Sequence, residues 1–427
     1  MDSRETQNKT AGLREILQAV AICTAVIAVA VLWISTMIKP RGDFLLHYEF
    51  GRRLRTGEFL YTGGMHLPYP PAWGMLFLPF SLLPLRVAMP LFFVFGIAAL
   101  AALLKILRDL TANFPRAKET AFWVAAVTMC VLSRFVLRDL ADGGENLVIV
   151  ALSWAGIYFF VKQKPLPGGA LLGLAIALKC TPLLFAGYLV LKRQWLAAIS
   201  TLIFSALFFV SPIVVQGPSA YFNHIRFWKG NIVAGVSQKD PSVGVLGPDE
   251  LANKSLRPML ARYLMRLPDG HPGRIASPAY VDFLKLPPAT AGLIIKLVTL
   301  CTGLAVFWLF VRSPGEMTGR NFLWECAIIN ALMLLFSPIT WGEHCVSLIP
   351  AVYLICLRFI DGRPVPRWIK AVLGITVFLL IVINRSTIGY ALSELGESYH
   401  VVTFCIIALT VVSFAFWNER VSALPAA

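Results

Sequence analysis

Long apolar segments, separated by short polar ones, dominate the amino-acid sequence. One helix needs about 20 consecutive apolar residues to cross the hydrocarbon core of a bilayer. The pattern therefore predicts an all-α polytopic membrane protein with roughly 10 to 12 transmembrane helices. The apolar segments fall at residues 16–38, 72–107, 120–137, 146–161, 166–191, 195–215, 289–311, 322–336, 345–357, 368–383 and 400–416.

Two of these segments contain helix breakers. Residues 72–107 include three prolines, and residues 166–191 include Lys179 and Pro182. Proline removes a helical hydrogen bond and clashes with the preceding turn. Each segment can therefore form either one kinked helix or two short helices.

The composition agrees with a membrane protein. Of the 427 residues, 57% are hydrophobic and 14% are charged, whereas soluble domains have about a quarter of their residues charged. The net charge of +15 would suggest nucleic-acid binding in a soluble chain. Here the Lys and Arg residues lie in short loops between apolar segments, which is typical of cytoplasmic loops. We therefore expect membrane lipids, and no nucleic acid, as partners. The basic loops are residues 105–118, 162–164, 192–193, 312–320 and 358–370.

Two longer polar loops separate the apolar segments. In residues 39–70, apolar and polar side chains alternate in a way that suits a short helix in the headgroup layer, with its arginines on lipid phosphates. Residues 216–288 are rich in proline and glycine but also contain aromatic side chains. This composition predicts a folded lid close to the membrane surface.

Polar residues that interrupt apolar surroundings are candidate functional residues, because such groups are costly at membrane depth. Asp43 directly follows the first apolar segment, although an aspartate there could also cap a short helix. Tyr69, Pro70 and Pro71 form a rigid extended corner, for which a purely structural role is the alternative. Lys179 stands alone in an apolar stretch, where a snorkelling lysine is the simpler interpretation.

Three further polar pieces are candidates. The turn at residues 138–146 contains Asp142, Glu145 and Asn146, and helix capping accounts for only part of it. Asn253 and Lys254 precede Ser255 in the long loop, where a capped loop helix is the alternative. Trp341 and His344 meet at a break between two apolar segments, where a tryptophan is often an interfacial anchor.

The order of these pieces resembles glycosyltransferase family 87. The resemblance rests on Asp43-Phe44, Gly57, Leu60-Tyr61, Tyr69-Pro70-Pro71, Pro79, Gly143-Gly144-Glu145-Asn146, Leu178-Lys179-Cys180-Thr181-Pro182-Leu183, Asn253-Lys254-Ser255-Leu256 and Ser337-Pro338-Ile339-Thr340-Trp341. It implies a GT-C type bundle with two extracytoplasmic loops. It also implies a polyprenyl-phosphate sugar, most often of mannose, as donor and a lipid or glycan as acceptor.

The resemblance also implies residue roles. Asp43 is the expected general base, with Asp142 in reserve. The expected ligands of the donor phosphate are Lys179, His344, Lys254 and Arg257, and those of the sugar or acceptor are Tyr61, Tyr69, Asp142, Glu145, Asn146, Asn253 and Trp341. No cofactor is required, because Lys and His can neutralise a single leaving phosphate. A divalent metal held by Asp43 and Asp142 is the alternative. One base opposite one leaving group favours inversion.

These expectations give a domain organisation and a location. The protein is expected in a bacterial plasma membrane with an extracytoplasmic active site. A transporter or flippase of a lipid-linked saccharide, and a ligase or polymerase that uses a polyprenyl-diphosphate glycan, are the alternatives. The expected parts are a cytoplasmic N-terminus (1–15), a first transmembrane helix (16–38), a first extracytoplasmic loop with an interfacial helix (39–70), a transmembrane catalytic module (71–215), an extracytoplasmic lid loop (216–288), C-terminal transmembrane helices (289–417) and a cytoplasmic tail (418–427).

Overall fold

The computed structural model describes residues 2–38, 43–62, 67–237, 240–245, 247–248, 253–275, 280–313, 315–317 and 319–421. The first half of the chain forms α1 (Asp2–Ile38), α2 (Phe44–Thr56), α3 (Trp73–Phe77), η1 (Phe80–Leu82), α4 (Leu85–Thr111), α5 (Ala117–Asp142), α6 (Glu145–Val161), α7 (Pro165–Leu178), α8 (Leu183–Leu191), α9 (Trp195–Val210) and α10 (Ile213–Phe227). The second half forms η2 (Trp228–Val233), η3 (Ala234–Ser237), β1 (Val243–Gly244), β2 (Gly247–Pro248), α11 (Leu256–Leu264), α12 (Pro272–Ile275), α13 (Pro288–Val311), α14 (Arg320–Phe336), η4 (Glu343–Leu348), α15 (Ile349–Ile360), α16 (Arg367–Val382), α17 (Arg385–Ser398) and α18 (Val401–Val421).

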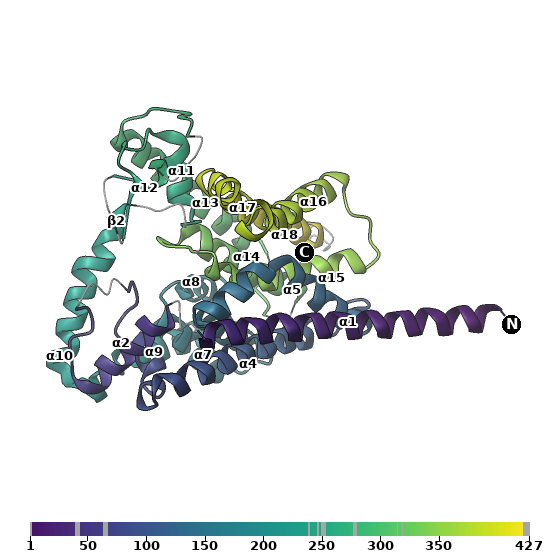
Figure 1. The fold of residues 1–427 in the computed structure, drawn as a ribbon, viewed down its shortest axis with the longest axis horizontal. Helices are drawn as coiled ribbons and strands as arrows, with labels where there is room; N and C mark the ends of the chain where they lie inside the picture. Colours follow the sequence, from purple (N-terminus) through teal and green to yellow (C-terminus); the bar gives the residue numbers. More distant parts are fainter. Residues whose placement is uncertain are drawn as a thin grey trace.

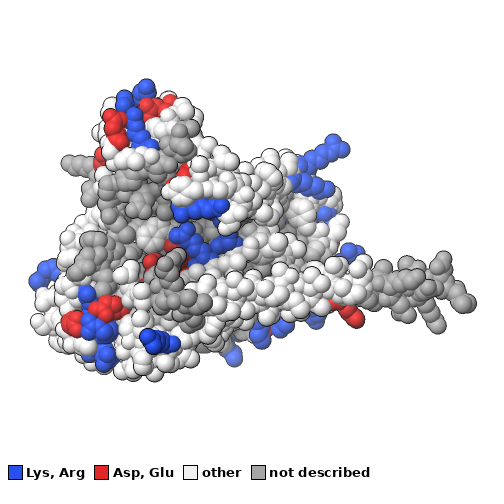
Figure 2. All heavy atoms as spheres, in the orientation of Figure 1, with Lys and Arg blue, Asp and Glu red and all other residues white. Residues whose placement is uncertain are grey.

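The described residues form a helical bundle with one short antiparallel strand pair, β1 with β2. Figure 1 shows α1 running along the bundle and extending beyond it, and α11 and α12 in a lobe that projects above α10. Most of the face seen in Figure 2 is uncharged, while charged side chains gather on the lobe, in the hollow below it and at the lower left of the view. An uncharged outer surface is what a bilayer requires.

Six of the described helical segments are individually long and apolar enough to span a membrane. They are Leu13–Ser35, Leu85–Thr111, Ala117–Asp142, Pro288–Val311, Glu343–Ile360 and Val401–Glu419. Two further pairs, α9 with α10–η2 and α16 with α17, reach that length only together and are bent by 84° and 102°. The shorter α6 and α7 are also apolar. The prediction of an all-α polytopic membrane protein is confirmed, and several of the expected crossings are bent or short helices.

Both segments that contain helix breakers form two or more helices. The first divides into α3, η1 and α4, and Pro84 directly precedes α4. The second divides into α7 and α8. Lys179, at the break, has extended backbone angles (φ −143°, ψ 113°), because the following residues lead into Pro182, whose ring cannot continue a helix.

Glycines allow α6, α7 and α9 to pack closely. A Cβ atom added to Gly173 of α7 would lie 2.7 Å from the backbone nitrogen of Ser205 in α9. A Cβ atom added to Gly168 would lie 2.9 Å from the carbonyl oxygen of Gly156 in α6. Small residues bring helix backbones together in this way within membranes. The packing fixes the end of α7, where Lys179 lies.

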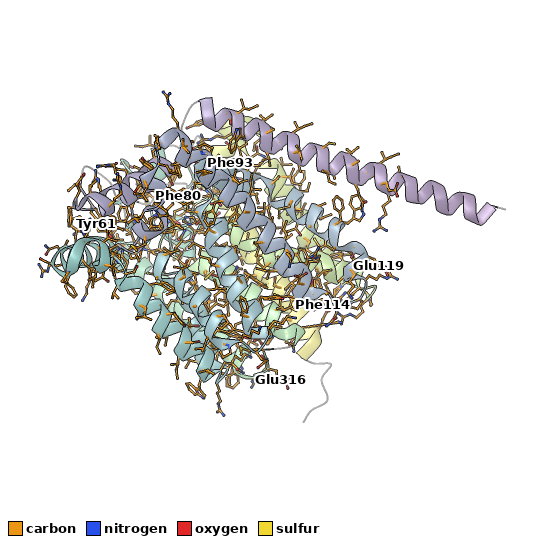
Figure 3. All side chains as sticks on the ribbon, turned by 90° about the horizontal axis from the view of Figure 1, so that it is seen from below. Tyr61, Phe80, Phe93, Phe114, Glu119 and Glu316 are labelled. Atoms are coloured by element: carbon orange, nitrogen blue, oxygen red, sulfur yellow. The ribbon has the colours of Figure 1, made fainter. Side chains whose placement is uncertain are left out.

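Several basic loops meet at one end of the bundle. Arg320 donates to the carbonyl oxygen of Asn113 over 3.2 Å, and Gln194 donates to that of Gly315 over 2.6 Å. These contacts join the α4–α5, α8–α9 and α13–α14 connections. Figure 3 shows Phe114, Glu119 and Glu316 on the side of the bundle away from Tyr61. The basic loops therefore lie opposite the region around Tyr61.

The two long loops contain the expected helices. In the first, α2 buries one face, which includes His47 as well as Phe44 and Leu54. The expectation that its arginines are available to lipid phosphates is wrong for Arg52, which pairs with Glu49 over 2.6 Å and with Glu58 over 2.7 Å. In the second loop, the described residues form α10, η2, η3, the strand pair, α11 and α12. Some helices cross the expected boundaries: α1 begins at Asp2 rather than near Ile16, and α10 continues beyond residue 215.

Candidate active site

Asp43 lies where the chain enters α2. Its carbonyl oxygen accepts a hydrogen bond from the backbone nitrogen of His47 over 3.0 Å, but its carboxylate makes no capping hydrogen bond. The carboxylate therefore does not cap α2, because it accepts no hydrogen bond from a backbone N–H of the first turn. Burial raises its pKa, and the neighbouring charge of Glu343 adds to this, while His47, Arg138 and Lys179 act in the opposite direction.

His47 is the partner of Asp43 that the sequence analysis did not select. It is completely buried, and its Nδ1 accepts a hydrogen bond from Nε1 of Trp73 over 3.1 Å. Burial lowers its pKa to about 4, so the ring is neutral near pH 7 and carries its proton on Nε2. That nitrogen lies 3.6 Å from Oε1 of Glu145. The spacing of Phe44, His47, Gly51 and Leu54 on one helical face was the signal that could have identified it.

In the turn between α5 and α6, one acidic residue caps α6 and the other polar residues do not. Gly143 and Gly144 have φ angles of 127° and 72°, which side chains with a Cβ rarely adopt. Asp139 accepts hydrogen bonds from the backbone nitrogen of Leu147 over 3.1 Å and from Nδ2 of Asn146 over 2.7 Å. Asp139 is therefore the cap of α6. Glu145 and Asn146, both buried, are not needed for capping.

Lys179 is connected to this turn. Its Nζ donates to Oδ1 of Asn146 over 2.6 Å and lies 5.4 Å from the centre of the Tyr69 ring. Nδ2 of Asn146 lies 3.2 Å from Oε1 of Glu145. The lysine is therefore directed into the protein by an amide, and it does not snorkel outward.

A cavity of about 280 Å³ brings together four of the predicted residues. Tyr69, Lys179, Trp341 and His344 all line it. Nδ1 of His344 accepts from the backbone nitrogen of Trp341 over 3.2 Å, so a neutral His344 carries its proton on Nε2. That buried Nε2 has no hydrogen-bond partner among the described residues. A cation and an N–H group thus meet at one cavity, which is the donor set that a phosphate oxygen requires.

An arginine joins the carboxylates at the edge of the site. Nε of Arg138 lies 2.8 Å from Oε2 of Glu343 and 3.4 Å from Oδ2 of Asp142. This pairing ties the end of α5 to η4, and it holds Asp142 beside a positive charge. Glu343 is a further site residue that was not selected from the sequence. The described residues contain no group of three or more His, Cys, Asp or Glu side chains that could hold a metal ion.

The remaining predicted residues do not line this cavity. Tyr61 donates to the carbonyl oxygen of Tyr69 over 2.9 Å and so supports the cavity wall from behind. Asn253 donates to the carbonyl oxygen of Pro338 over 3.1 Å and accepts from the backbone nitrogen of Thr340 over 3.0 Å. Lys254 is buried and pairs with Glu397. Asn253 and Lys254 therefore hold the long loop against the bundle.

Arg257 lies on another surface. It donates to the carbonyl oxygens of Asp240 and Val243, over 2.9 Å in each case. It lines a separate groove beside α13, which shares Ser337 and Pro338 with the cavity. The structure thus separates Arg257 from Lys179 and His344.

An apolar groove of about 570 Å³ adjoins the cavity. Cys180, Thr181, Ser337 and Pro338 line both spaces. Beyond them, the groove follows Leu184, Gly187, Tyr188 and Leu191 of α8 between α13 and α14. Polar groups at the cavity and apolar walls along the groove suit a ligand with a charged head and a long hydrocarbon chain.

The fold and this site define a polytopic membrane protein whose polar cavity opens into an apolar groove. The chain belongs to glycosyltransferase family 87, whose family model matches residues 67–338. The protein is thus a multi-pass membrane glycosyltransferase. Asp43 and His344 lie outside the matched residues.

Curated relatives have the same kind of activity. The chain is 26% identical over 335 residues to a polyprenol-phosphate-mannose-dependent alpha-(1-2)-phosphatidylinositol mannoside mannosyltransferase of Mycobacterium tuberculosis, covering 73% of this chain and 69% of that protein. It is 24% identical over 415 residues to the protein of the same name from Mycolicibacterium smegmatis, covering 89% and 86%. A Mycobacterium tuberculosis pentamannoside mannosyltransferase is 25% identical over 309 residues, covering 72% and 61%.

Proposed function

We propose that the protein transfers one mannose from a polyprenyl-phosphate-mannose donor to a mannosylated or unmannosylated phospholipid of the phosphatidylinositol type, with inversion at the anomeric carbon. The observation that carries the proposal is the direct connection between the cavity lined by Lys179 and His344 and the apolar groove. The names of the relatives support mannose as the sugar and a phosphatidylinositol mannoside as the acceptor class.

The donor fits this connection in one orientation. Its phosphate lies at Lys179 and the N–H of His344, and its prenyl chain passes Cys180 and Thr181 into the groove along α8. None of the described residues that line the groove is charged, so the groove offers no cation to a second phosphate. A single phosphate therefore suits the site better than a diphosphate.

The chemistry follows from this orientation. Asp43 accepts the proton of the acceptor hydroxyl, and the resulting oxygen attacks the anomeric carbon. The bond from that carbon to the phosphate oxygen breaks, and the electron pair stays on the phosphate. Lys179 and His344 stabilise the charge that develops there. A raised pKa makes Asp43 a stronger base than an exposed aspartate. Displacement from the opposite face converts a β-linked donor into an α-linked product.

In this proposal the chain's own cation and N–H group neutralise the leaving phosphate, so the step requires no resident metal. Tyr69 and Trp341 contact the sugar from the cavity wall. Glu145 and Asn146 act through Lys179 and His47, which they hold. Asp142, paired with Arg138, is the reserve base.

We also propose that the active site faces the outside of a bacterial plasma membrane. The basic loops that gather at the other end of the bundle support this orientation, because basic loops remain on the cytoplasmic side. The domain boundaries proposed from the sequence follow the same orientation.

Sugar transfer by the purified protein in nanodiscs tests the proposal. A panel of polyprenyl monophosphate sugars and one polyprenyl diphosphate glycan is supplied to wild type, Asp43→Asn and Asp142→Asn. Wild type should consume the mannose donor, and Asp43→Asn should lower turnover at least about a hundredfold. Asp269→Asn, an aspartate that is 79% exposed in the loop, is the matched control and should remain active.

Other results would contradict the proposal. Consumption of the diphosphate donor alone would indicate a ligase or polymerase. If no donor is consumed while labelled lipid-linked saccharide crosses the bilayer in proteoliposomes, the protein is a transporter. Full activity of Asp43→Asn with loss in Asp142→Asn would transfer the role of base to Asp142.

A further inference from the structure

A second groove lies on the other side of the Ser337–Pro338 turn. It has a volume of about 390 Å³ and is lined by residues of α11, α13 and α14. It shares Phe336, Ser337 and Pro338 with the apolar groove. Nothing in the proposed donor orientation occupies this space.

The grooves follow one face of α13. Gly292, Ile295 and Thr299 line the second groove, and Gly303, Val306 and Phe310 line the first. This spacing of three to four residues places all of them along one stripe, which spans about 27 Å at 1.5 Å per residue. Only three residues of α13, Ala291, Ile295 and Phe310, are buried. The side chains of α13 therefore leave two open grooves along this stripe.

The second groove differs from the first by its charge. Arg257 and Lys296 line it, and no acidic residue is found among its described lining residues. Lys296 has neither an ion-pair nor a hydrogen-bond partner within the described part of the chain. It lies about 12 Å along α13 from the start of that helix, counted at 1.5 Å per residue. Backbone carbonyls orient the Arg257 guanidinium.

We infer that this groove binds the acceptor as an anionic phospholipid, with its headgroup phosphate at Lys296 and Arg257 and an acyl chain against Ile295, Leu300 and Leu335. The identification of this lipid as the acceptor rests on the proposed function. It assigns the two lipids to two grooves that meet at the Ser337–Pro338 turn. A headgroup held at Lys296 lies beside that turn, whose Ser337 and Pro338 also line the cavity that contains Lys179.

A snorkelling lysine is the simpler interpretation of Lys296. It predicts no preference for a particular lipid and no contribution from Arg257. The inferred site predicts selection of anionic over zwitterionic lipid by both residues. The two interpretations therefore differ in a binding experiment that needs no catalysis.

Native mass spectrometry of the full chain, released from vesicles of equal parts phosphatidylinositol and phosphatidylcholine, tests the inference. Wild type should retain phosphatidylinositol preferentially, and Lys296→Met should reduce that retention about five- to tenfold. Arg257→Gln should reduce it too. Lys285→Met is the matched control, because Lys285 is a 67% exposed lysine just before α13 that does not line the groove.

Three results would overturn the inference. The first is equal retention of phosphatidylinositol by Lys296→Met and wild type, and the second is an equal loss of retention in Lys285→Met. The third is competition by soluble glycerophosphoinositol at the same concentration as the lipid, which would indicate a site for a free anion. Steady-state kinetics give a second readout, in which Lys296→Met raises KM for the acceptor and not for the donor. A chain without transferase activity that still selects phosphatidylinositol through Lys296 would contradict the proposed function but support this site.

Discussion

Lys179 and Asn146 are joined by a 2.6 Å hydrogen bond from Nζ to Oδ1, although 33 positions separate them in the chain. The lysine lies at the break between α7 and α8, and the asparagine lies in the first turn of α6. A neutral amide can hold an ammonium group without neutralising its charge. The arrangement therefore orients the lysine and leaves its charge available to a phosphate.

Replacing either residue should affect the donor. Lys179→Met should lower kcat/KM about a hundred- to a thousandfold, because it removes a cation from the leaving phosphate. Asn146→Ala should lower it about tenfold through misplacement of the lysine. Kinetics with varied donor at fixed acceptor provide the measurement. Asn330→Ala removes another buried asparagine and is the control for folding. A similar loss of activity in that variant would indicate general destabilisation.

The pH dependence of transfer should report the environment of Asp43. The base must be ionised to accept a proton, so kcat/KM should fall as the pH falls through its raised pKa. Glu343 raises that pKa and Arg138 lowers it. Glu343→Gln should therefore move the acidic limb of the profile to lower pH, and Arg138→Gln should move it to higher pH, each by roughly half a unit to one unit. Shifts in the same direction for both variants would contradict the assignment of the limb to Asp43.

The sequence predicted those site residues that interrupt an apolar run. Tyr69, Lys179, Trp341 and His344 stand at breaks between helices, and all four line the same cavity. Such breaks can be recognised in the sequence alone, because polar groups and prolines are rare within membrane helices. The all-α membrane fold was predictable for the same reason.

Residues whose environment depends on distant parts of the chain could not be predicted. Lys254 pairs with Glu397, and Arg257 bonds to carbonyls of its own loop. Nothing in the local sequence indicates either contact. His47 looked polar in an amphipathic segment, but the aromatic rings of Trp73 and Phe77 enclose it, with centroids 5.2 and 5.0 Å from its own. The spacing of Phe44, His47 and Leu54 marks one face of α2 in the sequence, but the partners that enclose His47 come from α3 and are not visible in that spacing.

The burial of His47 should make the protein sensitive to acid. Its pKa is about 4 in the folded protein against about 6.5 when unfolded. Between these values the unfolded chain binds more protons, so stability falls as the pH drops from 6.5 towards 4 and the effect is complete below 4. The total decrease in the free energy of unfolding is about 3 kcal/mol. Thermal unfolding in detergent should therefore show a smaller decrease over this range for His47→Gln than for wild type. Parallel curves for the two proteins would show that His47 titrates normally.

Glycines in the apolar groove offer a direct test of where the prenyl chain binds. Gly187 of α8 and Gly303 of α13 line the groove, and a Cβ atom added to either would meet nothing within 4 Å. Leucine at these positions fills the groove and also favours helix over glycine, so folding should not suffer. Gly187→Leu and Gly303→Leu should raise KM about tenfold or more for a decaprenyl-phosphate-mannose donor, but little for a donor with a two-isoprene chain.

Gly374→Leu is the matched control for these variants. Gly374 also has open space around it, but it lies in α16 and does not line the groove. It should leave KM unchanged for both donors. A chain-length effect limited to the groove variants would place the prenyl chain between α8, α13 and α14. If instead both donors lose affinity equally, the substituted leucines act on the cavity and the chain binds elsewhere on the bundle.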